Sequence, residues 1–217
     1  MNPVKFTKYA GLAFLLAVST LASAATVVKA PDLGNYWSPL SSSGTYTYAN
    51  SFVAPVTGTI TELGAWLSGG SSNLQYKVFG SIGGNASLGP DANALFASTN
   101  VMPGMSLGSL TFIDATSGIS GGTVIAGTTY WFAATTVGLG GSGSYNVGGH
   151  TQNSGLIVDN GTFWYSNDPS GVNFDGQRLP PEMAFSVSVA AVPEPETYGM
   201  LLAGLGLLGF VLRRKAS

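Results

Sequence analysis

Side chains able to carry acid–base or nucleophilic chemistry are scarce in this 217-residue chain, which has one histidine and no cysteine. Without thiols, cysteine nucleophiles and cysteine-ligated metal sites are excluded. The histidine, His150, follows two glycines in a loop-like stretch. The run Gly141-Ser142-Gly143-Ser144 lies in a low-complexity loop, so it does not form the strand-to-helix elbow of a serine nucleophile. We therefore expect His150 to be a loop residue.

The acidic side chains of the C-terminal third are a second group with capacity for chemistry: Asp159, Asp168, Asp175 and Glu182. The three aspartates stand beside Asn-Gly, Pro or Gly, and acids in such places commonly close turns. A carboxylate pair could instead hydrolyse a glycosidic bond, and the three aspartates with loop carbonyls could bind calcium. Because no Asp-x-Asp-x-Asp-Gly loop is present, we favour turn closure, with calcium as the alternative and no required cofactor.

Tryptophan rings are the remaining groups that could bind a ligand, since an exposed aromatic face can stack on a sugar ring. The chain has four of them: Trp37, Trp66, Trp131 and Trp164. Trp131 lies in the apolar run 130–134 and is expected in the core. Trp164 has Thr, Ser and Asn nearby, which makes it the best candidate for a sugar contact, but aromatic side chains in sandwich strands mostly pack inside, and we favour that for Trp164. No pattern here indicates a catalytic site, and we expect the protein not to be an enzyme.

Composition indicates that these residues belong to a charge-poor, β-rich body. Charged residues make up 8% of the chain and glycine reaches 31 residues, so Ser, Thr, Asn and backbone must cover the surface, as in extracellular β proteins. Residues 26–192 carry three basic and eight acidic side chains, a net charge of −5. Such a body lacks the basic patch that nucleic acid requires, and no disulfide can stabilise it.

Short β-prone runs alternate with turn residues along the middle of the chain, and no long stretch there has helical spacing. The run 74–80 alternates in the manner of a half-buried strand, and 59–68 places Leu63, Ala65 and Leu67 on one face and Trp66 on the other. The sequence therefore predicts an all-β fold, an antiparallel jelly-roll-like β-sandwich over 45–191. A lead-in loop is predicted at 25–44, where prolines and a serine run occur.

The first 24 residues have the pattern of a secretory signal peptide. Lys5 and Lys8 precede an apolar stretch, 10–22, and Ala22-Ser23-Ala24 is an A-x-A cleavage site. We predict cleavage by signal peptidase after Ala24 or Ala25. A retained signal anchor is the alternative, but the stretch is short and lacks charge on its downstream side.

The C-terminal residues 192–217 combine three different segments. Pro193-Glu194-Pro195 is followed by an uncharged run at 197–212 and then by Arg213-Arg214-Lys215. The run predicts a single transmembrane helix at about 197–212, near the lower limit of roughly 17–25 residues for a spanning helix. The basic triplet predicts a stop to translocation, with these residues on the cytoplasmic side. An ordinary membrane anchor is the alternative.

This order of segments resembles the PEP-CTERM sorting signal of Gram-negative bacteria that produce exopolysaccharide. The resemblance implies that exosortase, a membrane protease-transpeptidase, recognises Pro193, Glu194 and Pro195, and that this chain is its substrate. It also implies passage through the inner membrane and delivery to the cell envelope, the surface or the outside.

The body resembles, more loosely, the β-sandwich domains called choice-of-anchor. The residues that carry this resemblance are Ser51-Phe52-Val53, Gly58-Thr59-Ile60 and the run 126–132. Together the sequence predicts an exported surface or extracellular-matrix protein with a structural or adhesive role in an exopolysaccharide biofilm. The alternative is a carbohydrate-binding module for matrix polysaccharide.

Overall fold

The computed structural model describes residues 24–30, 33–41, 47–141, 143–150, 163–167, 170–174, 176–178, 182–192 and 195–216. Its contacts divide the chain into a strand-rich unit, Ala24–Ala191, and a second unit formed by the two ends of the chain. Residues 1–23 of the predicted signal peptide lie outside the described residues.

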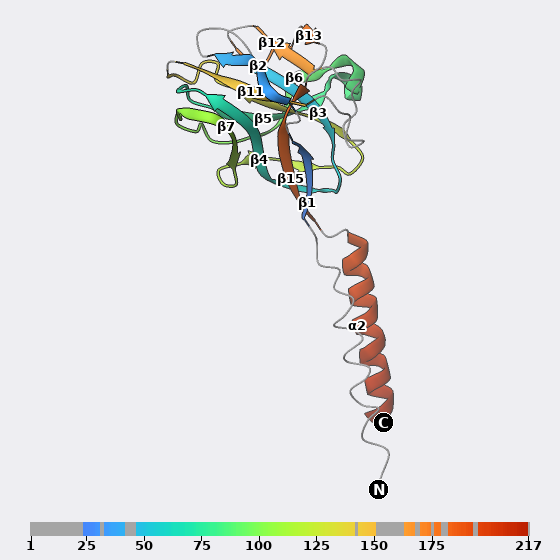
Figure 1. Ribbon diagram of the computed structural model, residues 1–217. Helices are drawn as coiled ribbons and strands as arrows, with labels where there is room; N and C mark the ends of the chain where they lie inside the picture. Colours follow the sequence, from blue (N-terminus) through green and yellow to red (C-terminus); the bar gives the residue numbers. More distant parts are fainter. Residues whose placement is uncertain are drawn as a thin grey trace. The chain divides into compact units, whose positions relative to one another are not determined.

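The strand-rich unit contains short strands throughout its described length (Figure 1). They are β1 (Ala24–Lys29), β2 (Leu33–Ser41), β3 (Thr47–Val53), β4 (Gly58–Gly69), β5 (Gln75–Ser81), β6 (Pro90–Ser98), β7 (Leu107–Ala115), β8 (Ser120–Gly121), β9 (Thr123–Val124), β10 (Thr129–Thr135), β11 (Ser144–His150), β12 (Phe163–Ser166), β13 (Gly176–Arg178), β14 (Glu182–Met183) and β15 (Phe185–Ala191). Two single 3-10 turns, η2 (Ile82–Gly84) and η3 (Ala86–Leu88), connect β5 to β6.

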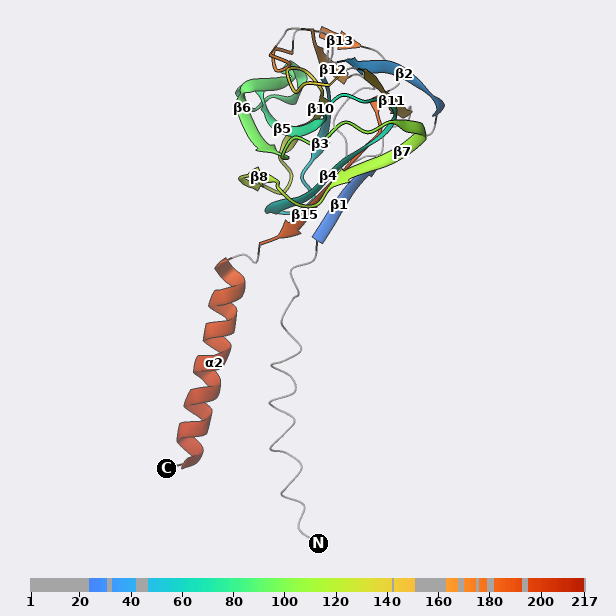
Figure 2. The ribbon, with the colours of Figure 1, turned by 90° about the vertical axis from the view of Figure 1, so that its left-hand side faces the viewer.

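The strands form two antiparallel sheets, which confirms the all-β sandwich predicted from the sequence. The first sheet has the order β1-β15-β4-β11-β14, with β2 added beside β11 and with β7 and β9 beside β4. The second has the order β13-β12-β3-β10-β5-β6-β8. Figure 2 shows the sandwich from a second side. The finer jelly-roll assignment stays a prediction.

The core between the sheets follows from the alternation of side chains along each strand. In β4, Leu63, Ala65 and Leu67 are fully buried, as predicted, and meet residues such as Phe132 and Phe185. The rings of Phe132 and Phe185 stack with centroids 4.9 Å apart and planes 7° from parallel. This contact joins the two sheets, because Phe132 belongs to β10 and Phe185 to β15.

A second, smaller core covers the outer face of the second sheet. Phe79 and Trp131 point away from the main core and are buried beneath Phe174, whose ring meets that of Phe79 edge-on at 5.4 Å. The Trp131 Nε1–H donates to Ser81 Oγ at 3.1 Å. The prediction that Trp131 is a core residue is therefore confirmed, although its core lies outside the sandwich. The second core also explains why Phe79 is buried where simple alternation predicts exposure.

The predicted lead-in loop at 25–44 is wrong where it falls on β1 and β2. Thr26, Val27 and Val28 are β-branched, and pairing β1 with β15 buries Val27 completely in the core. Pro39 occurs within β2, which pairs with β11 in an interrupted register. Such irregular pairing tolerates proline, which cannot donate a ladder hydrogen bond.

The second unit contains the helix α2 (Pro195–Ala216). Within the described part of the chain, no helix combines the length and the apolarity needed to cross a membrane. The prediction of a transmembrane helix at about 197–212 is thus not supported. The helix takes in Glu196 and the basic residues 213–215 as well as the apolar run.

A buried asparagine ties the two sheets together by a polar contact. Asn50 is fully buried on the core side of β3, and its Oδ1 accepts a hydrogen bond of 3.0 Å from the backbone N–H of Met183 in β14. That N–H lies in the other sheet, so the bond spans the core. A buried donor that loses its acceptor has no water to replace it.

Replacing Asn50 with alanine is therefore expected to lower the free energy of unfolding by about 1–3 kcal/mol. Urea unfolding of the purified protein measures this change. Asn93→Ala is the matched control, since Asn93 is exposed in β6, and its effect should stay within about 0.5 kcal/mol. Equal effects of the two substitutions would contradict the role given to Asn50.

Candidate functional site

The junction between the sandwich and the tail is short. β15 lies between β1 and β4, where Ala190 faces Ala24 and Ala191 faces Gly58. A Cβ at position 58 would collide with the Ala190 carbonyl, so glycine is needed for this close pairing. The strand ends at Ala191, and Val192 follows with 46% of its surface exposed.

The predicted sorting residues lie directly after this strand. Pro193 and Glu194 are outside the described residues, and Pro195 is the first residue of α2. Proline suits that position because its fixed φ matches the helix and its missing N–H is not needed there. Arg213, Arg214 and Lys215 fall in the last turns, where cations interact favourably with the helix dipole.

Trp164, the candidate sugar contact, is partly buried in β12. It faces Ala49 of β3 in the strand register and packs against the second core. A Cβ at Gly89 would lie 2.6 Å from the Trp164 ring, which means that the backbone at Gly89 already covers part of the indole. The side chain is therefore partly covered by protein, in keeping with the favoured expectation that it packs inside the sandwich.

The three calcium candidates, Asp159, Asp168 and Asp175, lie outside the described residues. Elsewhere in the chain, the described residues include no group of three histidine or acidic side chains able to hold a metal ion. The expectation that His150 is a loop residue is wrong, because it is the last residue of β11 and pairs with Glu182 in β14.

An aromatic pair lies on the outer face of the first sheet. Trp66 of β4 and Phe112 of β7 are opposite each other in the register, with ring centroids 4.4 Å apart and planes at 43°. Both are partly exposed. A Cβ at Gly64 would lie 2.5 Å from the Phe112 ring, and one at Gly148 would lie 3.0 Å from Trp66 Cβ. The side chains therefore lie close against the sheet.

The sequence analysis named Trp66 but missed Phe112 as its partner. The available signal was glycine at outward-facing positions of neighbouring strands, Gly64 in β4 and Gly148 in β11. Such glycines leave room for an aromatic side chain from the adjacent strand.

A hollow of about 310 Å³ adjoins this pair, with Phe112 in its wall. The other lining residues are Met102, Pro103, Met105, Ile113 and Asp114. Asp114 is exposed and is the ionisable side chain in that lining. The lining thus offers an apolar floor and one carboxylate that could accept hydrogen bonds from hydroxyl groups.

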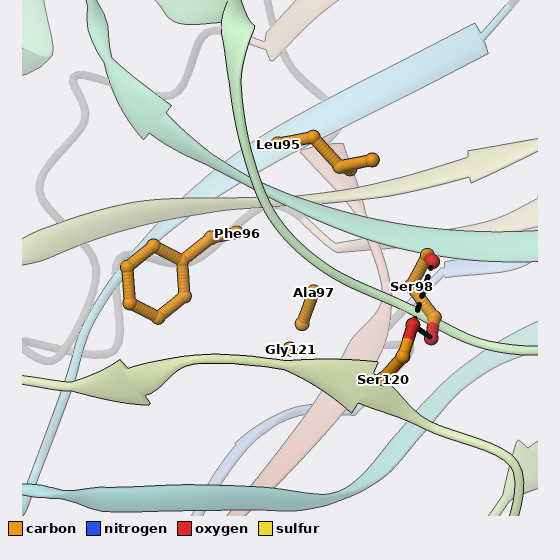
Figure 3. Close-up of a pocket in the computed structure, with 6 residues that line it drawn as sticks. All are labelled: Leu95, Phe96, Ala97, Ser98, Ser120 and Gly121. Atoms are coloured by element: carbon orange, nitrogen blue, oxygen red, sulfur yellow. Dashed lines mark hydrogen bonds between the residues drawn. The ribbon is translucent and has the colours of Figure 1, made fainter.

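A second hollow, of about 190 Å³, lies between β6 and β8 (Figure 3). Its lining includes Ser98 and Ser120, whose hydroxyls are 3.4 Å apart. Ser120 is the central residue of Gly118-Ile119-Ser120-Gly121-Gly122, a Gly-x-Ser-x-Gly sequence that the sequence analysis overlooked. It belongs to a strand rather than to a strand-to-helix turn, and the lining contains no histidine or acid. This arrangement does not supply a base for a serine nucleophile.

Burial alters two titratable groups of β5. Burial of Tyr76 raises the pKa of its phenol well above the ordinary value, and its hydroxyl donates to the Ile113 carbonyl at 2.7 Å. Burial lowers the pKa of the Lys77 ammonium on the opposite face of the strand. Both effects come from desolvation, and neither group lines either hollow.

Comparison with protein families assigns the tail. A family model described as the PEP-CTERM protein-sorting motif matches residues 191–215. The chain carries a PEP-CTERM sorting motif. The PEP-CTERM resemblance of the tail is thereby confirmed, and the motif indicates an exported protein that exosortase processes and sorts to the cell envelope. No curated protein matches the chain. The choice-of-anchor resemblance of the body stays a prediction.

Substitution of Gly89 tests the packing of Trp164. Gly89→Ala should lower the free energy of unfolding more than Gly84→Ala, because both glycines have positive φ, +88° and +74°, but only the first would meet a ring. We expect about 1–2 kcal/mol from the left-handed backbone conformation at either site and a further loss at Gly89. Chemical denaturation measures both.

In a Trp164→Ala background the further loss at Gly89 should disappear, since the ring is gone. If Gly89→Ala and Gly84→Ala have the same effect in the wild-type background, Gly89 does not pack on Trp164.

Proposed function

We propose that this PEP-CTERM protein is a non-enzymatic surface or extracellular-matrix protein with a structural or adhesive role, associated with the exopolysaccharide of a biofilm. The observation that carries the proposal is the sorting motif at 191–215, which begins where the sandwich ends. The described residues from Ala24 up to the motif belong to one strand-rich unit, so sorting delivers the sandwich itself.

Delivery in this proposal takes three steps. Signal peptidase removes the leader after Ala24 or Ala25, and the tail then holds the protein at the inner membrane for a time. Exosortase recognises Pro193-Glu194-Pro195 and removes the segment with the basic end. The tail therefore acts as a sorting signal, and the function of the mature protein belongs to residues 25–191.

A contact role rather than catalysis is supported by the make-up of the body. The two hollows are lined by apolar, hydroxyl and backbone groups and by a single carboxylate. A hydroxyl-rich, charge-poor surface can make many hydrogen bonds with polysaccharide and little electrostatic contact with polyanions. Such properties suit a matrix component.

The first test compares the wild-type protein with a Pro193→Ala, Glu194→Ala, Pro195→Ala triple variant, both recovered from the native host. The wild type should lack the basic end and leave the inner membrane, whereas the variant should retain Arg213-Arg214-Lys215 and stay there. Intact mass and cell fractionation measure these outcomes. If both proteins retain the basic end, the tail is a plain anchor and the sorting proposal fails.

Carbohydrate binding is a second candidate function, and the pair of Trp66 and Phe112 is the observation that favours it. Two partly exposed rings beside a hollow with one carboxylate, Asp114, offer both stacking and hydrogen bonding. In this proposal the candidate site lies on the first sheet, whereas the candidate from the sequence, Trp164, lies on the second.

Trp66→Ala is expected to weaken binding to exopolysaccharide purified from the host about tenfold, the loss that corresponds to about 1.4 kcal/mol. Trp164→Ala serves as the comparison, and it should leave binding within about twofold. Affinity electrophoresis in gels that contain the polysaccharide measures both. A loss confined to Trp164→Ala would return the site to β12, and no loss in either variant would favour a purely structural role.

A further inference from the structure

One end of the sandwich is formed by the segments that surround the exit of the tail. We call residues 54–58, 122–128 and 190–191 the tail-side rim. Ala191 pairs with Gly58, and Gly58 pairs in turn with Val124 of β9. β15 ends, and β1 begins, at this end of the sandwich (Figures 1 and 2).

Hydrogen bonds hold the two loops of the rim together. The backbone N–H of Ala126 donates to Thr57 Oγ1 at 3.1 Å, and that of Gly127 donates to the Ala54 carbonyl at 2.9 Å. The Ala54 N–H donates to the Thr128 carbonyl at 3.0 Å. These hydrogen bonds fix the conformation of the two loops, so the rim has a defined shape.

The rim is apolar and uncharged. None of its residues is Asp, Glu, Lys or Arg. Ile125 is 59% exposed, the highest value among the large apolar side chains of the described sandwich. Outside the rim, the faces of the same sheet carry acids such as Glu62 and Asp114. The absence of charge around this isoleucine suits the centre of a protein–protein interface, where charged residues are depleted.

The position of the sorting motif identifies that partner. The match begins at Ala191, which is still inside β15 and still paired with Gly58. Ala191 and Pro195 are four residues apart, and an extended chain covers at most about 3.6 Å per residue. Any enzyme that holds Pro193-Glu194-Pro195 must therefore lie within roughly 14 Å of the rim.

We propose that the tail-side rim, with Ile125 at its tip, is a second docking surface for exosortase. The enzyme then contacts its substrate at the motif and at the folded end of the sandwich. This inference rests on the proposed sorting function. A lipid surface is the less favoured occupant, because the rim has no basic residue to attract anionic headgroups.

The test introduces charge of either sign at the rim of the full-length protein in its host. Ile125→Glu and Ile125→Lys should each slow the loss of Arg213-Arg214-Lys215 about tenfold, as removal of a central contact residue does. Intact mass at successive times after a pulse of expression gives the rate. Ala126→Glu, on the same turn, should slow it in the same direction.

Val101→Glu is the matched control, since Val101 is also an exposed aliphatic residue, at 47%. It adjoins the bridge between Leu74 and Met102, at the start of β5. The other end of β5 lies near the rim, where Ser81 Oγ donates to the Thr129 carbonyl at 3.3 Å. The processing rate of Val101→Glu should equal that of the wild type, and limited proteolysis should show that every variant is folded.

Each other outcome has a definite meaning. Normal rates for the folded variants at positions 125 and 126 would overturn the docking surface, as would a slow rate for Val101→Glu. Slow processing with Glu but not with Lys at position 125 would indicate a lipid surface and also overturn it. Normal processing of the Pro193, Glu194 and Pro195 triple variant would instead overturn the sorting function itself.

Discussion

Hydrogen-bonded pairing of β15 on both of its edges is the constraint on which most of this structure depends. β1 supplies one partner and β4 the other, so the last strand before the tail lies inside the first sheet rather than at its margin. Each alternate residue of β15 enters the core, including Phe185, Val187 and Val189. A chain segment held in this way cannot shift without breaking two ladders and a core layer at once.

The same pairing links the two ends of the mature chain. β1 begins at Ala24, the last residue of the predicted leader, and the tail follows immediately after β15. Because Ala24 faces Ala190, the predicted leader cleavage site and the sorting motif start from neighbouring points of one sheet. The small residues at this junction follow from the close pairing of the strands, because Gly58 must allow the Ala190 carbonyl to approach closely. The local sequence of the junction is thus set by packing as well as by recognition.

The predictable parts of the fold are those that local patterns determine. Leu63, Ala65 and Leu67 alternate with residues of the opposite face, and that alternation alone places them in the core. The tail was identified because its three segments are contiguous and differ sharply in chemistry. By contrast, β1 looked like a loop, because its pairing partner lies some 160 residues away in sequence, as the register of Val27 with Val187 shows.

Sites built from distant segments were missed for the same reason. Trp164 has polar neighbours in sequence, but Gly89 and the second core cover part of its ring in the fold. Phe79 alternates correctly and yet is buried on the unexpected face, because Phe174 and Val172 pack on that side. Trp66 meets Phe112 only after β4 and β7 pair. Period and composition predict the face that a residue occupies, but not what the rest of the chain places on that face.

With charged residues at 8% of the chain, the body relies on such packing and on hydrogen bonds. Salt screens these interactions far less than it screens surface ion pairs, and this property suits a protein that is exported out of the buffered cell interior.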